Sequence, residues 1–463
     1  MPHAPQLSRV EALVSAFKRG RYDLLGLNPK QQQAMAILCD KTTTALAFGG
    51  GANGGKSWLG GDWLLLSALA YPETRWFIGR EELKRLREST FLTIGKVRKA
   101  NGLPLATYRY NGSDHYLQFP NGSRIDLLEL KYLPSDQLYE RYGSVEYTGG
   151  WIEEGGEVNF GAYDTLKSRV GRQLNDKYGL LGKILITCNP KKNWLYTEFY
   201  KPFKDKVLKS GLRFLQSLVG DNLKRESGAI ALLESLTDKS KKERLLFGNW
   251  EYEDDPAVLM QYDDITNIFT NAHVLGGGQR YLTVDVARQG EDKTVIFAWV
   301  GWRGRLVKVF DKNTIPELVA EVRRLATVHM VPMSQVVLDE DGVGGGARDY
   351  LPGSKGFVNN SRPLKVNNEP QNYENLKTQC YYRLAELRIN KHAVYLEGMS
   401  PQQQELLTEE LGQVKSHDAD KEGKLRLVPK DKIKQLLGRS PDYADALMMR
   451  EYFELASTFR GLL

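Results

Sequence analysis

A glycine-rich segment with the spacing G-x-x-x-x-G-K-S constrains this chain more than any other feature of its sequence. An apolar, β-branched stretch at residues 42–48 precedes it and predicts a buried strand, and the Leu- and Ala-rich residues 58–70 predict a helix. Strand, loop and helix in this order are typical of a phosphate-binding loop, whose glycines let backbone N–H groups converge on a phosphate. The loop residues expected to bind nucleotide are Gly50, Gly51, Ala52, Asn53, Gly54, Gly55, Lys56 and Ser57.

Two side chains at the end of this loop carry the predicted chemistry. Lys56 is expected to reach the β- and γ-phosphate oxygens, and the Ser57 hydroxyl is expected to ligate Mg²⁺. The N-terminus of the following helix adds partial positive charge. The segment therefore predicts an ATP and Mg²⁺ site, with a purely structural glycine loop as the alternative.

A second acidic element follows the loop in the chain. Residues 147–154 predict a strand that ends in two adjacent carboxylates, Glu153 and Glu154. In a nucleotide-hydrolysis site one acid holds the Mg²⁺ shell and the next polarises the attacking water. We assign the metal role to Glu153 and the base role to Glu154, with an exposed acidic turn as the alternative.

Polar residues in two other segments are candidates for nucleotide contacts. Residues 180–190 predict a buried strand that closes on Thr187 and Asn189, where side chains could sense the γ-phosphate. A plain strand-to-turn exit is the alternative. Upstream of the loop, Gln31 and Gln32 stand at a predicted helix start, where a glutamine amide can read the adenine edge. A solvent-facing polar helix start explains them equally well.

The C-terminal half carries a different set of acids. Asp285 and Asp339 each occur in or after an apolar strand, and a helix near residue 442 opens with Asp442 and Asp445 three positions apart, hence on one face. Such carboxylates are the ingredients for two divalent metals, Mg²⁺ or Mn²⁺, that hydrolyse a phosphodiester. Asp442 could instead be only a helix cap, whereas a buried Asp285 is hard to explain as core.

Length and charge bound the class of protein. At 463 residues two domains are expected, and no apolar run approaches the length of a membrane span. The net charge of +7 is compatible with an anionic partner, and residues 415–439 are rich in Lys and Arg. This basic segment suits a polyanion brought to the metals, although a solvated charged hairpin is the alternative.

The composition along the chain predicts two α/β domains. Residues 1–252 form the first, with a helical segment at 1–40 and a helical, lysine-rich region at 200–252. An acidic, proline-bearing stretch begins the predicted linker at 253–275, and residues 276–463 form the second domain.

The order of these motifs resembles the large terminase subunit of tailed double-stranded DNA bacteriophages. The resemblance runs from about Asn28 to Leu447. It rests on the segments 50–57, 151–154, 187–190, 248–251, 284–287, Asp339 with 342–344, and 440–447.

The resemblance implies both a fold and an activity. It implies an ASCE-type P-loop ATPase domain with a mostly parallel sheet and a helical lid, followed by a ribonuclease H-like nuclease domain. Such a protein hydrolyses ATP to pump double-stranded DNA into a procapsid and cuts concatemers with a metal-dependent endonuclease. The implied partners are DNA, the portal protein, the small terminase subunit and further copies in a ring on the portal, within the host bacterial cytoplasm and without a membrane.

Two departures from the family pattern concern the ATPase site. Glu153 stands where many relatives have Asp, and the phosphate loop lacks the Arg that many terminases carry there. An arginine that stabilises the γ-phosphoryl charge must then come from elsewhere. Arg141, acting on a neighbouring subunit, is the first choice and Arg80 the second, with a surface ion pair as the alternative for both.

Other classes of protein remain open from the sequence. A cellular DNA helicase or translocase with a fused nuclease would need tandem ATPase cores or helicase motifs, and one core is visible. A small-molecule kinase leaves the C-terminal acids unexplained. A non-enzymatic DNA-binding protein is the third alternative.

Overall fold

The computed structural model describes residues 8–457, apart from positions 134, 137, 223, 253–256, 288–291, 342, 418–422 and 438. The chain forms two compact units, Met1–Asp254 and Asp255–Leu463. The acidic start of the predicted linker, 253–256, lies outside the described residues. The rest of that predicted linker is folded: it contains α11 (Tyr262–Asn267), whose Ile265 is buried within the second unit.

The first unit is built on an eight-stranded sheet with the order β3-β4-β5-β2-β6-β7-β1-β8. Neighbouring strands from β5 to β8 are parallel, and β3 and β4 continue the sheet as an antiparallel hairpin. One strand, β7, separates β1 from β6, which is the arrangement of an ASCE-type P-loop ATPase. The strands are β1 (Ala45–Gly49), β2 (Arg75–Arg80), β3 (Arg109–Asn111), β4 (Tyr116–Gln118), β5 (Arg124–Glu129), β6 (Gly149–Ile152), β7 (Lys183–Cys188) and β8 (Leu212–Gln216).

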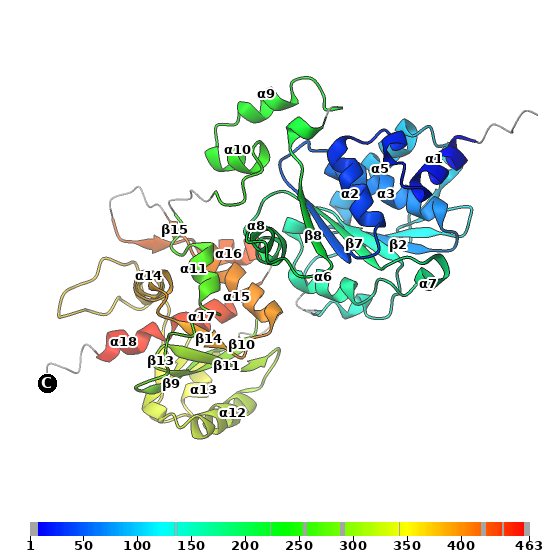
Figure 1. Cartoon of the computed structure of the whole chain (residues 1–463). Coiled ribbons are helices and arrows are strands. Elements are labelled where there is room, and N and C mark those ends of the chain that lie inside the picture. Colours follow the sequence, from blue (N-terminus) through cyan, green and yellow to red (C-terminus); the bar gives the residue numbers. More distant parts are fainter. Residues whose placement is uncertain are drawn as a thin grey trace, which may run out of the picture. The chain divides into compact units, whose positions relative to one another are not determined.

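Helices cover both faces of this sheet: in Figure 1, α2, α3 and α5 lie on one side of the strands and α6 on the other. One expectation was wrong, because the region 200–252 is not all helical. It contains β8, whose Leu212, Phe214 and Leu215 are buried while Arg213 is exposed. The helices are α1 (Arg9–Lys18), α2 (Pro29–Cys39), α3 (Lys56–Ala70), α4 (Leu83–Arg85), α5 (Phe91–Ala100), α6 (Phe160–Lys167), α7 (Asn175–Tyr178), α8 (Lys201–Lys204), α9 (Ala229–Glu234) and α10 (Lys239–Leu245).

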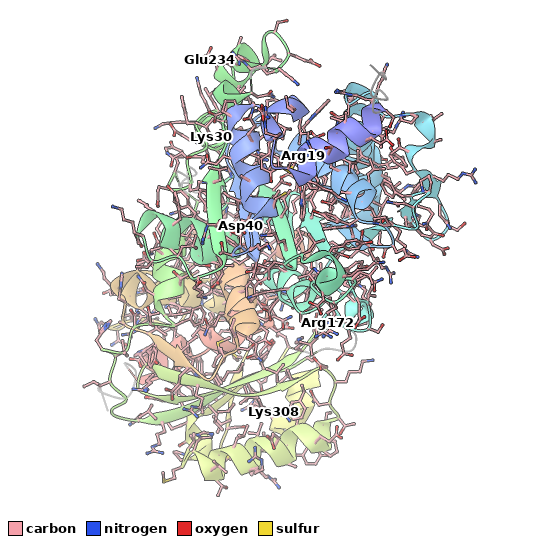
Figure 2. All side chains as sticks on the ribbon, turned by 45° about the vertical axis from the view of Figure 1, so that its right-hand side comes forward. Arg19, Lys30, Asp40, Arg172, Glu234 and Lys308 are labelled. Carbon is pink, nitrogen blue, oxygen red and sulfur yellow. The ribbon has the colours of Figure 1, made fainter. Side chains whose placement is uncertain are left out.

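A polar cluster fixes the start of β1, the strand that leads into the phosphate loop. Asp40, labelled in Figure 2 just after α2, accepts hydrogen bonds from the Thr43 backbone N–H and from Lys183 Nζ, both at 2.7 Å. Lys183 Nζ also donates to the Thr43 carbonyl at 2.7 Å. The ion pair therefore ties β7 to the entry of β1 and sets the position of the loop.

The second unit is built on a six-stranded sheet with the order β13-β12-β9-β10-β11-β14. Strand β10 is antiparallel to both β9 and β11, whereas β12 is parallel to β9 and to β13. This is the ribonuclease H-like arrangement, with β14 added parallel to β11. The strands are β9 (Arg280–Asp285), β10 (Thr294–Val300), β11 (Arg303–Phe310), β12 (Val336–Asp339), β13 (Lys355–Phe357) and β14 (Tyr395–Glu397), and a separate hairpin pairs β15 (Ser416–His417) with β16 (Arg426–Leu427).

Helices again cover both faces of this second sheet. Helices α12 and α13 lie on one face, where Val322 and Leu325 pack against Val284 and Leu338, and α17 packs against β9 and β10 on the other. No helix in the described part of the chain is long and apolar enough to cross a membrane. The helices are α12 (Ile315–Val328), α13 (Val343–Arg348), α14 (Leu376–Leu387), α15 (Pro401–Gln413), α16 (Lys430–Leu437), α17 (Asp442–Met448) and α18 (Glu451–Ser457).

Candidate functional sites

The glycine loop between β1 and α3 is shaped by close contact with the residue that follows β8. Gly50 has φ +140°, and a Cβ atom there would lie 2.1 Å from the Ser217 carbonyl oxygen. Ser217 Oγ donates to the Gly54 carbonyl at 2.7 Å, and its N–H donates to the Gly49 carbonyl at 2.9 Å. Only glycine fits at position 50 without moving this neighbour. The predicted succession of strand, glycine loop and helix is present, from β1 to α3.

Lys56, the first residue of α3, lies inside the loop with 8% of its surface exposed. Its Nζ donates to the Gly51 carbonyl, to the Gly50 carbonyl at 3.4 Å and to Asn189 Oδ1 at 3.3 Å. Burial lowers the pKa of Lys56, and the charge of Glu154 opposes that shift. The ammonium group is thus surrounded by neutral oxygens, which phosphate oxygens would replace with stronger, charged partners.

Glu153 follows β6 and is 4% exposed. Burial raises the pKa of Glu153 to about 7, although the Ser57 hydroxyl and Arg80 oppose the shift. Its Oε2 is buried without a hydrogen-bond partner among the described residues, and Arg80 Nη1 lies 3.8 Å away. A Mg²⁺ ion would supply the missing partner for this oxygen, so Ser57 and Glu153 fit the predicted metal role.

Glu154 has φ +49° and ψ +49°, a left-handed conformation that is costly for a residue other than glycine. Its Oε2 accepts a hydrogen bond from Asn189 Nδ2 at 3.3 Å. Burial raises the pKa of Glu154, while the charge of Lys56 opposes the shift. Asn189 thus joins the predicted base to the loop lysine through the two ends of one amide, and the strained backbone holds the carboxylate there.

Thr187 lies in β7, between the loop strand and the acidic strand. Its Oγ1 accepts a hydrogen bond from Trp151 Nε1 at 2.9 Å, and the residue is 2% exposed. The Trp151 ring also fills the space beside Gly60 of α3, where a Cβ atom would lie 2.5 Å from it. Thr187 therefore links strands, whereas Asn189, two residues on, faces the charged groups.

The structure brings Gln31, the third residue of α2, to the phosphate loop. Gln31 Nε2 donates to the Gly55 carbonyl at 2.8 Å, and its Oε1 accepts from the Asn28 backbone N–H at 2.9 Å. Gln32 Nε2 donates to the Leu27 carbonyl at 2.8 Å. Both ends of the Gln31 amide are thus engaged within the chain. Adenine reading by Gln31 and Gln32 stays a prediction.

The two arginines predicted to reach a γ-phosphate are both held by acceptors of the first unit. Arg80, at the end of β2, donates from Nη1 to Ser89 Oγ at 2.6 Å, and its Nε lies 3.5 Å from Glu157. Arg141 donates to Asp136 at 2.5 Å and to the Lys131 carbonyl at 2.6 Å. Arg80 therefore lies beside Glu153 of its own site, while Arg141 is anchored to its own loop.

Residues from the C-terminal part of the unit also enclose the loop, and these were not predicted from the sequence. The Leu245 carbonyl accepts a hydrogen bond from the Ala52 N–H at 2.7 Å, and Arg244 Nε donates to the Pro190 carbonyl at 2.8 Å. The only sequence signal was the motif 248–251 shortly after them. A backbone carbonyl contact leaves no trace in side-chain identity, so Leu245 and Ser217 could not be found from sequence.

In the second unit the structure brings the four predicted acids to one edge of the sheet. Strands β9 and β12 are parallel with Leu338 opposite Val284, so Asp339 ends its strand next to Asp285. Helix α17 begins at Asp442 and packs against β9 and β10. Each of the four carboxylates, those of Asp285, Asp339, Asp442 and Asp445, is at most 7% exposed.

Crowding of anions perturbs these carboxylates. Burial raises the pKa of Asp285 well above its ordinary value, and the charges of Asp442 and Asp445 add to the shift. Burial likewise raises the pKa of Asp339 to about 6, although the Asp341 N–H donates to it at 3.0 Å and opposes the shift. Removing this repulsion requires protons or cations.

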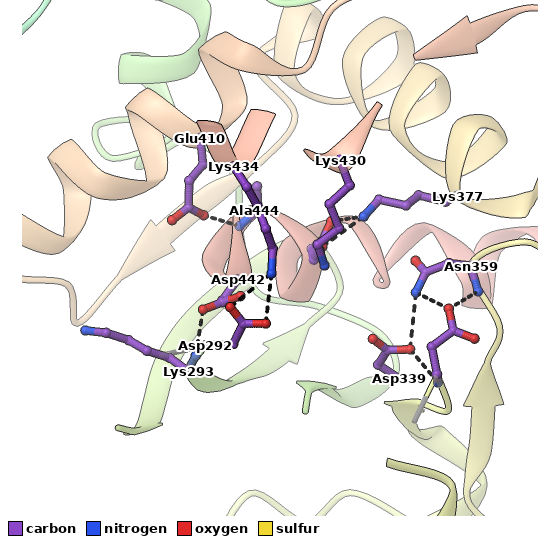
Figure 3. A network of polar contacts seen from close by, with 12 residues as sticks. Asp292, Lys293, Asp339, Asn359, Lys377, Glu410, Lys430, Lys434, Asp442 and Ala444 are labelled. Atoms are coloured by element: carbon purple, nitrogen blue, oxygen red, sulfur yellow. Dashed lines mark hydrogen bonds and ion pairs between the residues drawn. The ribbon is translucent and has the colours of Figure 1, made fainter. Parts of the chain in front are cut away.

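Asp445 is already paired with two cationic side chains, Lys377 and Lys430, both of which are labelled in Figure 3. Their Nζ atoms lie 2.7 and 3.0 Å from its carboxylate, and the Tyr381 hydroxyl donates to it at 2.6 Å. Burial disfavours its charge, but Lys377 and Lys430 outweigh burial and lower the pKa of Asp445. Lys377 and Tyr381 were missed in the sequence, although their spacing of four places them on one face of α14.

Asp442 has a different surrounding from Asp445. Its Oδ2 accepts a hydrogen bond from the Lys293 backbone N–H at 2.7 Å, and burial raises the pKa of this carboxyl. Beside it in Figure 3, Asp292 forms an ion pair with Lys434 at 3.0 Å. Among the ion pairs of the described residues, none joins Asp442 to an ammonium group. Of the two acids on α17, Asp442 is therefore the one whose carboxylate would not have to leave a lysine to bind a metal.

Several basic side chains of the segment 415–439 form ion pairs with acids of the same unit. Lys430 pairs with Asp445, Lys434 with Asp292, and Arg439 Nη1 with Glu410 at 2.7 Å. Residues 418–422 and 438 lie outside the described residues. These three basic groups lie among acids, and a role of the segment in binding a polyanion stays a prediction.

The donors suit a divalent cation, but their arrangement does not form a ligand shell. Among the residues that the structure describes, no three His, Cys, Asp or Glu side chains are gathered closely enough to hold a metal ion. Carboxylate oxygens are the preferred ligands of Mg²⁺ and Mn²⁺, and the mutual repulsion at Asp285 is what a cation relieves. The carboxylates of Asp285, Asp339 and Asp442 are therefore donors of the right type, whereas their spacing in this structure does not close a metal site.

Comparisons with known proteins find structural neighbours at low similarity. No protein-family model matches the sequence, and no curated protein matches it. Structural neighbours are large terminase subunits of phages. The ADP complex of the large terminase from a thermophilic bacteriophage is 15% identical with a TM-score of 0.41, covering 92% of this chain and 99% of that chain.

Two further neighbours match at similar levels. Another crystal form of the large terminase from the same thermophilic phage is 14% identical with a TM-score of 0.40, covering 98% of this chain and 100% of that one. The nuclease domain of the large terminase subunit gp2 of bacterial virus Sf6 is 21% identical with a TM-score of 0.34, covering 42% of this chain and 97% of that one. Likeness at this level assigns no activity, so the residues of the two sites must carry the assignment.

Proposed function

We propose that this chain is the large subunit of a phage terminase: unit one hydrolyses ATP to translocate double-stranded DNA into a procapsid, and unit two cuts the DNA. One observation carries the proposal. A phosphate loop whose lysine is joined through Asn189 to Glu154 stands in the same chain as a ribonuclease H-like sheet with four buried acids at one edge. A helicase with tandem ATPase cores is less well supported, because the described part of the chain has one such sheet.

In the first unit the residues support in-line transfer of the γ-phosphoryl group to water. The water oxygen bonds to the γ-phosphorus while the bond to the β–γ bridging oxygen breaks, and ADP leaves with that electron pair. Glu154 takes the proton of the attacking water, and Asn189 holds its carboxylate in place. Lys56 exchanges its carbonyl partners for phosphate oxygens. Mg²⁺, held by Ser57 and Glu153, would offset phosphate charge.

In the second unit the acids support hydrolysis of a phosphodiester. Asp285, Asp339 and Asp442 would hold one or two Mg²⁺ or Mn²⁺ ions, which activate water and stabilise the leaving oxygen. Lys377 and Lys430 hold Asp445 ionised beside them. The DNA backbone is polyanionic, and the net positive charge of this chain would attract it.

We further propose the assembly in which this chemistry acts. One subunit touches only a short stretch of DNA, so processive pumping needs several copies in a ring on the portal protein. The small terminase subunit would deliver the DNA, and the work would take place in the host bacterial cytoplasm. Arg141 remains the candidate to reach a neighbouring subunit's nucleotide, because a ring interface can offer its guanidinium new partners.

The ATPase half of the proposal is tested with Glu154→Gln. The amide keeps the shape of the side chain and removes the base, so DNA-stimulated ATP hydrolysis should fall by about 10²–10⁴-fold. Glu226→Gln, which changes an exposed carboxylate of the same unit, is the matched control. If Glu154→Gln hydrolysed ATP like the wild type, Glu154 would not be the general base.

The nuclease half is tested with Asp285→Asn in a plasmid-cleavage assay with Mg²⁺ or Mn²⁺. Loss of this central carboxylate should abolish cutting and leave ATP hydrolysis intact. Asp349→Asn, at an exposed position of the same unit, should cut like the wild type. Retained cutting in Asp285→Asn places the nuclease centre elsewhere.

A further inference from the structure

Arg244 is the one arginine of α10, and it lies beside the proposed reacting groups of the first unit. Its Nε donates to the carbonyl of Pro190 at 2.8 Å. Asn189, the residue before Pro190, contacts both Lys56 and Glu154. Arg244 is thus one residue removed from the hydrogen-bond chain that joins loop lysine and base.

The free donors of Arg244 distinguish it from the other two candidate arginines. Arg141 spends both terminal nitrogens on protein acceptors, and Arg80 donates from Nη1 to Ser89 Oγ. Apart from the bond to Pro190, Arg244 makes no hydrogen bond or ion pair with the residues described in the structure. Its two terminal nitrogens, with four N–H groups, therefore remain available for a charged oxygen ligand.

The backbone around Arg244 is fastened to the phosphate loop. The next residue, Leu245, accepts the Ala52 N–H at 2.7 Å, and a Cβ atom on Gly51 would lie 2.5 Å from the same carbonyl. Three residues on, the Gly248 carbonyl accepts from Gln216 Nε2 at 2.8 Å, next to the end of β8. These contacts fix the end of α10 to the phosphate loop and to the end of β8. The backbone of Arg244 is therefore held in place, and its side chain can reach a bound phosphate from there.

We propose that Arg244 supplies, within its own subunit, the arginine that the phosphate loop lacks, by donating to the γ-phosphate oxygens of bound ATP. The inference rests on the proposed ATP hydrolysis and names a further catalytic residue for it. As the bond to the β–γ bridging oxygen breaks, charge on the γ-phosphoryl oxygens and the leaving ADP is met by the guanidinium. Arg244 exchanges no proton and forms no covalent bond. Loss of the cleaved phosphate removes its ligand, so α10 senses the state of the nucleotide.

The test compares Arg244→Ala and Arg244→Lys with the wild-type full chain. Arg244→Ala should lower kcat for ATP hydrolysis by about 10²–10³-fold, because a transition-state donor is lost. ADP affinity should stay within about 3-fold, since ADP lacks the γ-phosphate, while tight binding of ADP with aluminium fluoride is lost. Arg244→Lys keeps the charge without the paired donors and should recover part of kcat. Arg225→Ala is the matched control, because among the residues that the structure describes Arg225 donates only to the nearby Asn222 carbonyl.

Three results would overturn the inference. Arg244→Ala with kcat within about 3-fold of wild type excludes a transition-state contact of this size. If both variants lose ADP affinity by as large a factor as they lose kcat, Arg244 only maintains the structure of the loop and does not act on the γ-phosphate. Recovery of hydrolysis on mixing Arg244→Ala with Glu154→Gln chains shows that the arginine serves a neighbour. A wild-type chain without ATPase activity overturns the proposed function itself, and this inference with it.

Discussion

The two candidate sites surround their charged groups with opposite arrangements of charge. In the first unit a single lysine is held by neutral oxygens, and one asparagine stands between it and the carboxylate of Glu154. In the second unit the lysines are inserted among the carboxylates, and Asp445 is neutralised by two of them. Under the proposed function, the first site would exchange neutral ligands for phosphate oxygens, whereas the second would have to exchange internal cations or protons for metal.

The largest expected effect separates the two acids at the start of α17. Asp442→Asn should abolish metal-dependent cutting with little loss of stability, because burial already disfavours the charge of Asp442. Asp445→Asn should lower the free energy of unfolding by about 3 kcal/mol, because Lys377 and Lys430 lose a buried partner. Plasmid cleavage and urea unfolding of both variants measure the contrast.

Asp349→Asn serves as the control for this pair, since its side chain is exposed in the same unit. If Asp445→Asn were as stable as the wild type and inactive, Asp445 would be the metal ligand and the lysine pairs would be incidental. The two units would then differ only in how many lysines lie near their acids, and no longer in whether a lysine pair takes an acid out of metal binding.

The next effect concerns the loop geometry of the first unit. Gly50→Ala places a Cβ atom 2.1 Å from the Ser217 carbonyl at φ +140°, so the loop must move. A strain of about 1–3 kcal/mol should appear as a roughly 10- to 100-fold weaker affinity for ATP, measured by calorimetry. Gly95→Ala in α5 is the control, because a Cβ there meets nothing within 4 Å. Equal ATP affinity in the two variants would mean that the loop is less constrained than its contacts indicate.

A third effect is the pH dependence created by Glu153. Burial raises its pKa from 4.5 to about 7 in the folded protein. Between these pH values the folded state binds more protons than the unfolded state, so this group's contribution to stability falls as pH rises through the window. At pH 8 without metal the cost is at most about 3 kcal/mol. Glu153→Gln should therefore raise the Tm at pH 8 and change it little at pH 4.5.

The control for this effect is added Mg²⁺ with ATP. Ligands at the buried Oε2 would favour the ionised carboxylate, so they should stabilise the wild type at pH 8 more than Glu153→Gln. A Tm difference between variant and wild type that is the same at both pH values would remove the electrostatic explanation. The second unit offers the parallel case of Asp339, whose pKa is raised to about 6.

What could be predicted from sequence differs between the two sites for a physical reason. The phosphate loop is contiguous, and glycines, lysine and serine at fixed spacing are sufficient to define it, so the strand, loop and helix at 45–70 were expected and are present. The acids of the second unit could be named, because each ends a strand or opens a helix. Their lysine partners could not, since Lys377 comes from α14 and meets Asp445 only through folding.

Other failures of the sequence analysis come from backbone contacts and from composition. The strand β8 was hidden in a lysine-rich region because its buried Leu212, Phe214 and Leu215 are flanked by charged helices. The carbonyl oxygens of Ser217 and Leu245, which shape the loop, have no side-chain signature. The linker was overestimated because acidic residues 263 and 264 continue the polar composition into α11, which is anchored by buried Ile265.

The smallest expected effect tests whether Gln31 belongs to the frame or to the nucleotide site. Its amide caps α2 at Asn28 and donates to the Gly55 carbonyl, so Gln31→Ala should lower the free energy of unfolding by about 1 kcal/mol. Because both ends of the amide are engaged, the preference for ATP over GTP should hold in steady-state hydrolysis. Gln32→Ala, which loses one bond to the Leu27 carbonyl, is the control. If Gln31→Ala instead erased the preference for ATP, the amide would have to turn toward adenine on binding, and the first site would depend on rearrangement as much as the second.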